Sequence, residues 1–200
     1  MMFMLSQQVL KVIKWERDTL DASFLSHWLT EFFKGKPWNE YLMCPRCKSF
    51  DDFGLSHTYG VDEVSNKVMD VCPFCGTKMQ HFWNQERIEY YLFNRPNSDG
   101  VVALVEGEVA GWCRGYPINE VTFYIDTVAI LPQYRSQPGI TPFLEEFINF
   151  LAQKRLKGYR RFITRTHKKA PNIRLLLRKL GFCENGPSED DPERTYWILN

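Results

Sequence analysis

Two short cysteine motifs constrain the first half of this 200-residue chain more than any other feature. Cys44-Pro45-Arg46-Cys47 and Cys72-Pro73-Phe74-Cys75 each hold two thiols in one turn, and 24 residues separate them. Two such turns can direct four thiolates at one ion, which is the ligand set of a structural zinc site. We therefore predict one Zn²⁺ bound by Cys44, Cys47, Cys72 and Cys75; the alternatives are two disulfides or unrelated free thiols. Four thiolates leave no open coordination position, so the chemistry must lie elsewhere in the chain.

The composition is that of a globular protein, with 44% hydrophobic and 15% aromatic residues. The length predicts one domain, or one domain that carries an insertion. No run of about 18 apolar residues is present to span a membrane. The apolar start, Met1 to Leu5, has no basic residues before it and is a poor signal peptide. Metal-binding thiols without an export signal favour the reducing cytoplasm, which is the location we expect.

Charge is unevenly distributed along the chain. Residues 147–183 contain eleven Lys and Arg residues and no Asp or Glu, whereas the remainder has fourteen basic and 24 acidic residues. A basic segment in an otherwise acidic protein indicates a polyanionic ligand, either a phosphorylated cofactor or nucleic acid. The alternative is a set of solvated helix faces that happen to be basic.

Hydrophobic periodicity predicts a mixed α/β domain in which helices cover a partly antiparallel sheet. The predicted helices are 21–33, 141–157 and 171–180, and the predicted strands are 9–15, 101–105, 109–113, 121–130, 160–166 and 195–199. Asp21 or Thr19 is the expected N-cap of the first helix, and from residue 88 onward the pattern changes to strands. The chain divides into a first strand and helix (1–40), an inserted four-cysteine lobe (41–82) with a ribbon hairpin over 60–70, and the main core (83–200).

The predicted strand that contains Phe123 runs through a short loop into a helix. Such a junction offers unpaired backbone N–H groups and the positive end of the helix dipole, which together can bind an anion. Gly139 would allow the backbone to approach a phosphate closely. Many strand–loop–helix units bind nothing, so this pattern alone does not define a site.

Ile130-Leu131-Pro132-Gln133-Tyr134-Arg135 resembles the acyl-coenzyme A signature V-x-P-x-Y-R of the GNAT superfamily of N-acyltransferases. The stretch Asn172 to Leu180 followed by Gly181-Phe182 resembles the last core helix of that family and its terminal K-L-G-F. The resemblance covers about residues 101–199. It implies a GNAT-like fold, with a central twisted sheet flanked by helices, into which the four-cysteine lobe is inserted as a zinc ribbon. It also implies transfer of an acetyl group from acetyl-CoA to a primary amine of a small molecule or protein.

The same resemblance implies where the cofactor binds. The backbone around Val128 and Ile130 would pair with the pantetheine arm like an extra strand. The other residues implied at the cofactor are Arg135, Ser136, Gln137, Gly139, Ile140, Thr141 and Asn172. The chain departs from the family pattern at two places. Ser136 and Pro138 occupy the first two glycine positions of the loop, and Leu177 stands where the family often has a tyrosine that protonates the departing thiolate.

Amine acetylation needs a base for the amine proton, and Asp126 is our candidate. Strict alternation would put it on the same face as Val128 and Ile130, and polyamine-type members of the family carry an acidic residue at its position. The alternative is a structural Asp that pairs with a neighbouring Arg. His167 and three tyrosines are further candidates for proton transfer; the tyrosines are Tyr116, Tyr124 and Tyr134.

Two other functions remain open from the sequence. The zinc lobe and the basic segment 147–183 could bind nucleic acid, so that acyl transfer would act on a modified base. The altered loop and Leu177 also fit an inactive acyltransferase fold that uses the zinc ribbon to bind a partner. An amine acceptor and acetyl-CoA remain the partners that the sequence favours.

Overall fold

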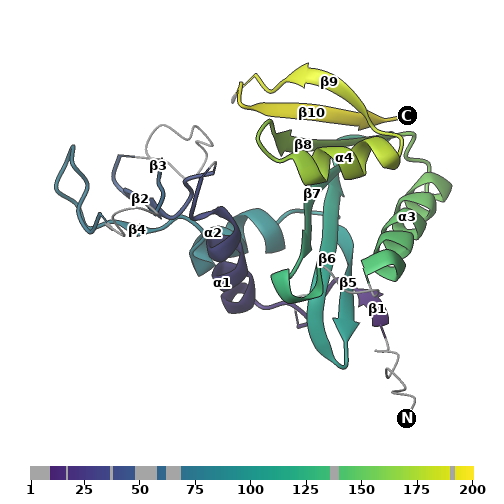
Figure 1. The fold of residues 1–200 in the computed structure, drawn as a ribbon, viewed down its shortest axis with the longest axis horizontal. Coiled ribbons are helices and arrows are strands. Elements are labelled where there is room, and N and C mark those ends of the chain that lie inside the picture. The colour runs from purple at the N-terminus through teal and green to yellow at the C-terminus, as the bar shows by residue number, and fades with distance from the viewer. Residues whose placement is uncertain are drawn as a thin grey trace, which may run out of the picture.

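The computed structural model describes residues 10–16, 18–36, 38–47, 58–61, 69–135, 140–189 and 192–200. Its main body is a seven-stranded sheet in the order β1-β5-β6-β7-β8-β10-β9 (Figure 1). The strands are β1 (Leu10–Lys14), β5 (Asp99–Val105), β6 (Glu108–Pro117), β7 (Thr122–Ile130), β8 (Arg161–His167), β9 (Cys183–Pro187) and β10 (Arg194–Leu199). Neighbouring strands are antiparallel except for the parallel pair β7 and β8. The predicted mixed α/β class is therefore confirmed, although β9 was not predicted.

The helices are α1 (Ala22–Phe33), α2 (Gln85–Ile88), α3 (Ile140–Leu156) and α4 (Pro171–Lys179). A π-helical turn, η2 (Glu89–Phe93), continues α2, and a 3₁₀ turn, η3 (Pro132–Tyr134), follows β7. Asp21 caps α1 as predicted, because its carboxylate accepts the Phe24 N–H at 2.7 Å. The expected change to strands at residue 88 is wrong. Asn84 accepts the Arg87 N–H at 2.9 Å and starts a helix there.

Helices cover both faces of the sheet, and each face has its own core. The α3 and α4 face buries Phe123, Phe147, Phe162, Leu177 and Trp197. The α1 and α2 face buries Leu25, Leu29, Ile88, Leu92 and Trp112. Figure 1 shows α1 and α2 on one side of β5 to β7, and α3 on the other. Full burial of each large apolar side chain contributes about 1.5–3 kcal/mol, so the two cores hold the sheet from both sides.

Strands β5 and β6, both of which the sequence predicts, form an antiparallel hairpin. Its two turn residues, Glu106 and Gly107, have φ values of 53° and 88°. A two-residue turn with both φ values positive matches the right-handed twist of the strands on either side. The turn therefore fixes the register in which β6 lies between β5 and β7.

A β-bulge interrupts β7 at Asp126. Arg114 pairs with Thr127 and Gly115 pairs with Ile125, so Asp126 is an extra residue on β7. The bulge reverses the alternation of the strand. Phe123 and Ile125 before it, and Val128 and Ile130 after it, all pack on the α3 and α4 core.

Strands β7 and β8 separate soon after they meet. Their pairing covers only Thr122 to Tyr124 of β7 and Arg161 to Ile163 of β8. Beyond this point β7 continues to Ile130 and β8 to His167, and no described strand lies between them. The part of the two strands that is not paired therefore includes the carboxyl ends of both.

The four-cysteine lobe follows α1 and extends from one end of the body (Figure 1). It contains a second sheet in the order β3-β2-β4, formed by β2 (Leu42–Met43), β3 (Thr58–Tyr59) and β4 (Gln80–His81). Leu42, Cys44, Cys72 and Met79 form its small core. Most of the ribbon hairpin expected over 60–70 lies outside the described residues. No helix in the described part of the chain is long and apolar enough to cross a membrane.

Candidate functional site

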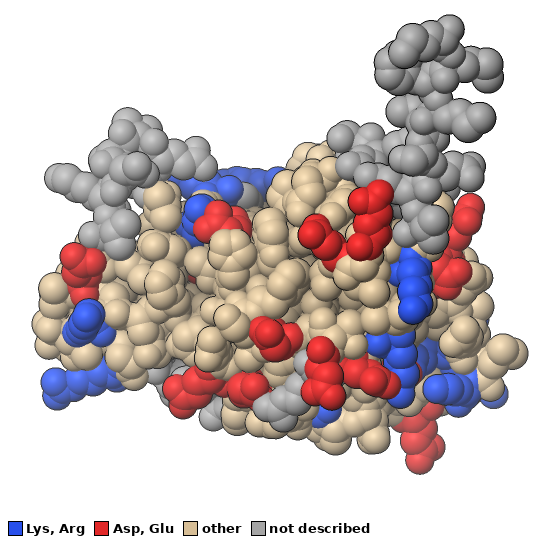
Figure 2. Space-filling model, turned by 90° about the horizontal axis from the view of Figure 1, so that it is seen from below, with Lys and Arg blue, Asp and Glu red and all other residues tan. Residues whose placement is uncertain are grey.

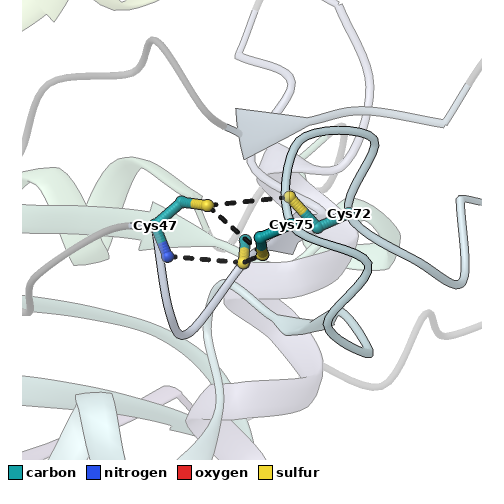
Figure 3. A group of neighbouring side chains, drawn as sticks. Cys47, Cys72 and Cys75 are labelled. Atoms are coloured by element: carbon teal, nitrogen blue, oxygen red, sulfur yellow. Dashed lines mark hydrogen bonds between the residues drawn. The ribbon is translucent and has the colours of Figure 1, made fainter.

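The four cysteines of the two motifs converge in the lobe, and Figure 3 shows Cys47, Cys72 and Cys75 with their sulfurs together. All four sulfurs lie within 4.8 Å of one another. Individual Sγ–Sγ distances are 3.5 Å for Cys44–Cys75, 3.8 Å for Cys47–Cys72 and 3.4 Å for Cys47–Cys75. A tetrahedral Zn²⁺ with Zn–S bonds of about 2.3 Å spaces its sulfurs about 3.8 Å apart. The set therefore fits one tetrahedral ion, and none of the four cysteines is in a disulfide.

The surroundings of the sulfurs also suit thiolate ligands. The Cys47 N–H donates to Cys44 Sγ at 3.4 Å. The Thr77 hydroxyl lies 3.2 Å from Cys75 Sγ, and hydrogen bonds with the hydroxyl and the backbone of Thr77 lower the pKa of that thiol to about 6. Cys47 shows the opposite shift, since its contacts with Cys75 and Cys44 raise its pKa to about 12. Gly76, directly after the second motif, has a φ of 70°, a left-handed conformation that glycine adopts at little cost. Polar contacts of this kind favour the charged form in which cysteine binds metal.

Asp126 forms an ion pair on the α1 and α2 face of the sheet. Its Oδ2 accepts from Arg114 Nη1 at 2.5 Å. Arg114 is completely buried, and its Nη2 also donates to the Leu92 carbonyl in η2. The Asp126 side chain is 23% exposed, and its Oδ1 accepts no hydrogen bond from any residue that the structure describes. One carboxylate oxygen is thus held by Arg114 while the other remains able to accept a proton.

The expected facing of Asp126 is wrong. Strict alternation would place it with Val128 and Ile130, but those residues pack against the α3 and α4 core, whereas Arg114 holds Asp126 on the opposite face. The bulge causes the difference, because the extra residue reverses the alternation. Burial raises the pKa of the Asp126 carboxyl, and the charges of Arg114 and Arg95 oppose this shift. A raised pKa makes a carboxylate a stronger base.

The other candidates for proton transfer lie in different places. The rings of Tyr116 and Tyr124 are 5.4 Å apart across β6 and β7, and burial raises the pKa of both hydroxyls. Tyr134 lies in η3, and its pKa is raised by burial and by Glu108. His167 is buried at the end of β8, with its ring 4.8 Å from that of Trp38. Only the first two tyrosines belong to the surroundings of Asp126.

A second buried carboxylate lies where the lobe joins the body. Glu40 Oε1 accepts from Arg194 Nη2 at 2.6 Å, and Oε2 accepts from Trp83 Nε1 at 3.1 Å. The guanidinium of Arg194 also lies 5.9 Å from the Trp38 ring. Burial raises the pKa of Glu40, and the charge of Arg194 opposes this shift. We call Trp38, Glu40, Trp83 and Arg194 the lobe junction; it links the lobe to β10 and, through Trp38, to the end of β8.

The structure describes six of the nine predicted cofactor residues. Val128 and Ile130 lie on the part of β7 that pairs with no described strand on its β8 side, and Asn172 is exposed at the start of α4. Arg135 Nε donates to the Ile130 carbonyl at 2.9 Å, and its guanidinium lies 5.3 Å from the Phe32 ring. Ile140 and Thr141 are the first residues of α3. The remaining three, Ser136, Gln137 and Gly139, lie outside the described residues.

The basic segment 147–183 spans most of α3, all of β8 and α4. Several of its cations have internal partners: Lys154 pairs with Asp99, Arg165 donates to Ser188, and Arg174 and Arg178 both pair with Glu184. On the face that Figure 2 shows, basic and acidic side chains lie in separate small groups among uncharged ones. The described residues that are visible on this face therefore form no continuous basic surface.

Sequence reasoning missed Arg114, Arg95 and Glu40. A signal for Arg114 was present, because it is the only cation in the otherwise uncharged stretch 109–117, and a buried cation needs a counter-charge. Asp126-Thr127, two polar residues in succession, was a signal for the bulge. Glu40 carried no local signal, since its partner Arg194 lies 154 residues away in sequence.

Comparison with solved structures finds proteins of similar fold. An acetyltransferase from Streptococcus agalactiae is 20% identical, with 57% of this chain and 73% of that chain covered and a TM-score of 0.47. Ard1 from Thermoplasma volcanium is 17% identical, covering 58% and 78%, with a TM-score of 0.48. A GNAT family acetyltransferase from Elizabethkingia anophelis, solved with acetyl-CoA bound, is 18% identical, covering 57% and 82%, with a TM-score of 0.46.

No curated protein matches the chain. The model of the Acetyltransferase (GNAT) family matches residues 68–182, which is more than half of the chain. The matched range begins just before the second cysteine motif and ends after α4, so it includes Asp126 and the separation of β7 and β8. The chain therefore belongs to the GNAT family of acetyltransferases, and the protein is an enzyme of acyl transfer.

Proposed function

We propose that the protein moves an acetyl group from acetyl-CoA to a primary amine of a small molecule or protein, with Asp126 as the general base. The observation that carries this proposal is the position of Asp126. Its Oδ1, which accepts no hydrogen bond from the described residues, lies at the bulge of β7, on the strand whose β8-side edge pairs with no described strand from Ile125 to Ile130. An open strand edge can pair with an extended ligand, and the pantetheine arm of acetyl-CoA is such a ligand.

The reaction then uses few groups. The amine nitrogen attacks the thioester carbonyl carbon, the carbon–sulfur bond breaks, and coenzyme A leaves as a thiolate. The proton lost by the amine goes to Asp126 Oδ1 and from there to solvent, and the thiolate takes up a proton from water, so the products are an amide and the thiol. Arg114 keeps the Asp126 side chain in place through Oδ2. General base catalysis of this kind contributes about 10²–10⁴-fold to the rate.

We further propose that the four thiolates hold one structural Zn²⁺ and that the lobe helps to bind the acceptor. The distances between the four sulfurs support the binding of one metal ion. The lobe junction supports a role of the lobe in binding the acceptor. Trp38 contacts His167, which ends the part of β8 that is not paired with β7. The internal partners of the basic segment give no support to nucleic acid as the acceptor.

Two measurements test these proposals on the purified protein. Acetyl-CoA should raise the melting temperature, because a ligand that binds only the folded state stabilises it. An amine should then cause release of the coenzyme A thiol. An unchanged melting temperature at millimolar acetyl-CoA would contradict the cofactor proposal. Elemental analysis should give one zinc per chain, and deletion of residues 41–82 should reduce acceptor use more than acetyl-CoA binding.

A further inference from the structure

The face of the sheet that carries Asp126 also carries arginines and tyrosines from four strands. Tyr116 of β6 pairs with Tyr124 of β7, and Arg165 of β8 pairs with Tyr196 of β10. Phe162 and Trp197 pack in the α3 and α4 core, so alternation places Arg165 and Tyr196 on the opposite face. We call Tyr116, Tyr124, Arg165, Tyr196 and Arg95 the arginine–tyrosine strip. All five side chains are partly exposed.

Arg95 is the member of the strip that is held in place and still has donors to offer. Its Nε donates to the Tyr91 carbonyl at 3.1 Å, and its guanidinium lies 4.2 Å from the centre of the Tyr116 ring. These two contacts fix the plane of the guanidinium group. Its two terminal nitrogens make no hydrogen bond or ion pair with any residue that the structure describes. A fixed guanidinium with open terminal donors is suited to bidentate binding of a carboxylate or phosphate.

The balance of charge around Asp126 is positive. Asp126 is paired with Arg114, so those two charges cancel each other locally. Arg95 and Arg165 both act on the Asp126 carboxyl, where their charges lower a pKa that burial raises. The strip itself contains no carboxylate. An amine that brings its own negative charge would therefore be favoured here over a neutral amine or a polyamine, whose additional cations Arg95 would repel.

We propose that the acceptor is an amine that also carries an anionic group, a carboxylate or a phosphate, and that Arg95 binds this group while the amino group lies at Asp126. Arg95 is then a residue that determines specificity. The inference rests on the proposed acetyl transfer, and it adds the chemical class of the acceptor. The tyrosine rings of the strip provide flat apolar sides for the part of the acceptor between its two charged groups.

Direct binding tests this proposal independently of turnover. Calorimetry on protein saturated with coenzyme A would compare 4-aminobutyrate with butylamine, and phosphoethanolamine with ethanolamine. Each pair differs by one anionic group, and the two pairs distinguish carboxylate from phosphate. We expect at least one anionic amine to bind about tenfold more tightly than its neutral partner, as one charge-assisted hydrogen bond can provide.

Variants show whether Arg95 causes the difference. Arg95→Gln should bring the Kd of the preferred anionic amine within about twofold of the Kd of its neutral partner. Arg95→Lys should retain part of the preference, because lysine keeps the charge without the planar guanidinium group. Lys179→Gln removes the same charge from α4 on the other face and should leave the preference unchanged. A thermal shift with acetyl-CoA checks that each variant is folded.

The proposal is overturned if neither anionic amine binds more tightly than its neutral partner, or if Arg95→Gln retains the full preference. Failure of acetyl transfer itself would look different. In that case no amine would release the thiol from acetyl-CoA, while the binding preference and its loss in Arg95→Gln would still be measured directly.

Discussion

Two carboxylate–arginine pairs of this protein differ in which partner is buried. In the Asp126–Arg114 pair the arginine is completely buried and the aspartate is 23% exposed. In the Glu40–Arg194 pair the glutamate side chain is 4% exposed and the arginine 21%. Both oxygens of Glu40 accept hydrogen bonds, whereas Oδ1 of Asp126 accepts none from the described residues. A carboxylate can take a proton from a ligand only if an oxygen is accessible, so the first pair suits chemistry and the second suits attachment of the lobe.

Metal removal should give the largest effect. It should disturb the Glu40–Arg194 pair and leave the Asp126–Arg114 pair intact. Metal binding provides most of the folding free energy of small zinc modules, about 10 kcal/mol or more. A chelator or Cys72→Ser should therefore unfold the lobe and disturb Glu40 at its base, with a change in tryptophan fluorescence from Trp38 and Trp83. Acetyl-CoA should still raise the melting temperature, since the edge of β7 proposed to bind it belongs to the seven-stranded sheet and not to the lobe. Loss of acetyl-CoA binding in the metal-free protein would show that the seven-stranded sheet depends on the folded lobe.

Asp126→Asn should affect turnover more than folding. The amide keeps a hydrogen-bond acceptor for Arg114 but cannot accept the amine proton, so we expect kcat to fall about 100-fold or more. Stopped-flow detection of thiol release at saturating acetyl-CoA measures this directly. The base role is excluded if the variant turns over like the unmodified protein.

Glu40→Ala should affect folding more than turnover. It removes the partner of Arg194 and a nearby negative charge of the fully buried Arg87, so the free energy of unfolding should fall by about 3 kcal/mol. Urea denaturation measures this change. Glu184→Ala is the matched control, since it breaks exposed pairs with Arg174 and Arg178 and should cost less than about 1 kcal/mol. Equal costs for the two variants would remove the distinction between a buried and an exposed pair.

The smallest effect concerns pH. Asp126 accepts a proton only when it is ionised, and burial raises its pKa. The value of kcat/KM should therefore fall as the pH decreases through a pKa above the ordinary range of aspartate. This acidic limb should be absent from the residual activity of Asp126→Asn. A pH profile with the same acidic limb in both proteins would assign it to another group.

Most elements of the fold could be predicted from the sequence because each has a local signal. Asp21 is an N-cap signal for α1, Glu106-Gly107 is a turn signal between β5 and β6, and the spacing of apolar residues indicates α3 and α4. The helical segment 85–93 was missed because it contains only two short turns of different type, so no regular spacing develops. Strand β9 was missed because all its residues are exposed and it carries no apolar pattern.

The site was predictable only in part, and the reason is physical. Asp126 could be predicted as a candidate because it is a carboxylate next to a family motif. The face of the sheet on which its side chain lies depends on the pairing of β6 with β7. Glu40 depends on a contact between the two ends of the chain. Interactions of this kind are set by tertiary structure and leave no periodic trace in the sequence.

The bulge at Asp126 has a consequence for how this strand tolerates change. A substitution at position 126 alters one side chain and leaves both cores in place. Deletion of the same residue would restore strict alternation, so that one half of β7 would present its apolar side chains to the wrong face. Either Phe123 and Ile125 or Val128 and Ile130 would lose their core. Natural variation and library design should therefore keep the number of residues between Phe123 and Ile130 constant, whichever residue type stands at position 126.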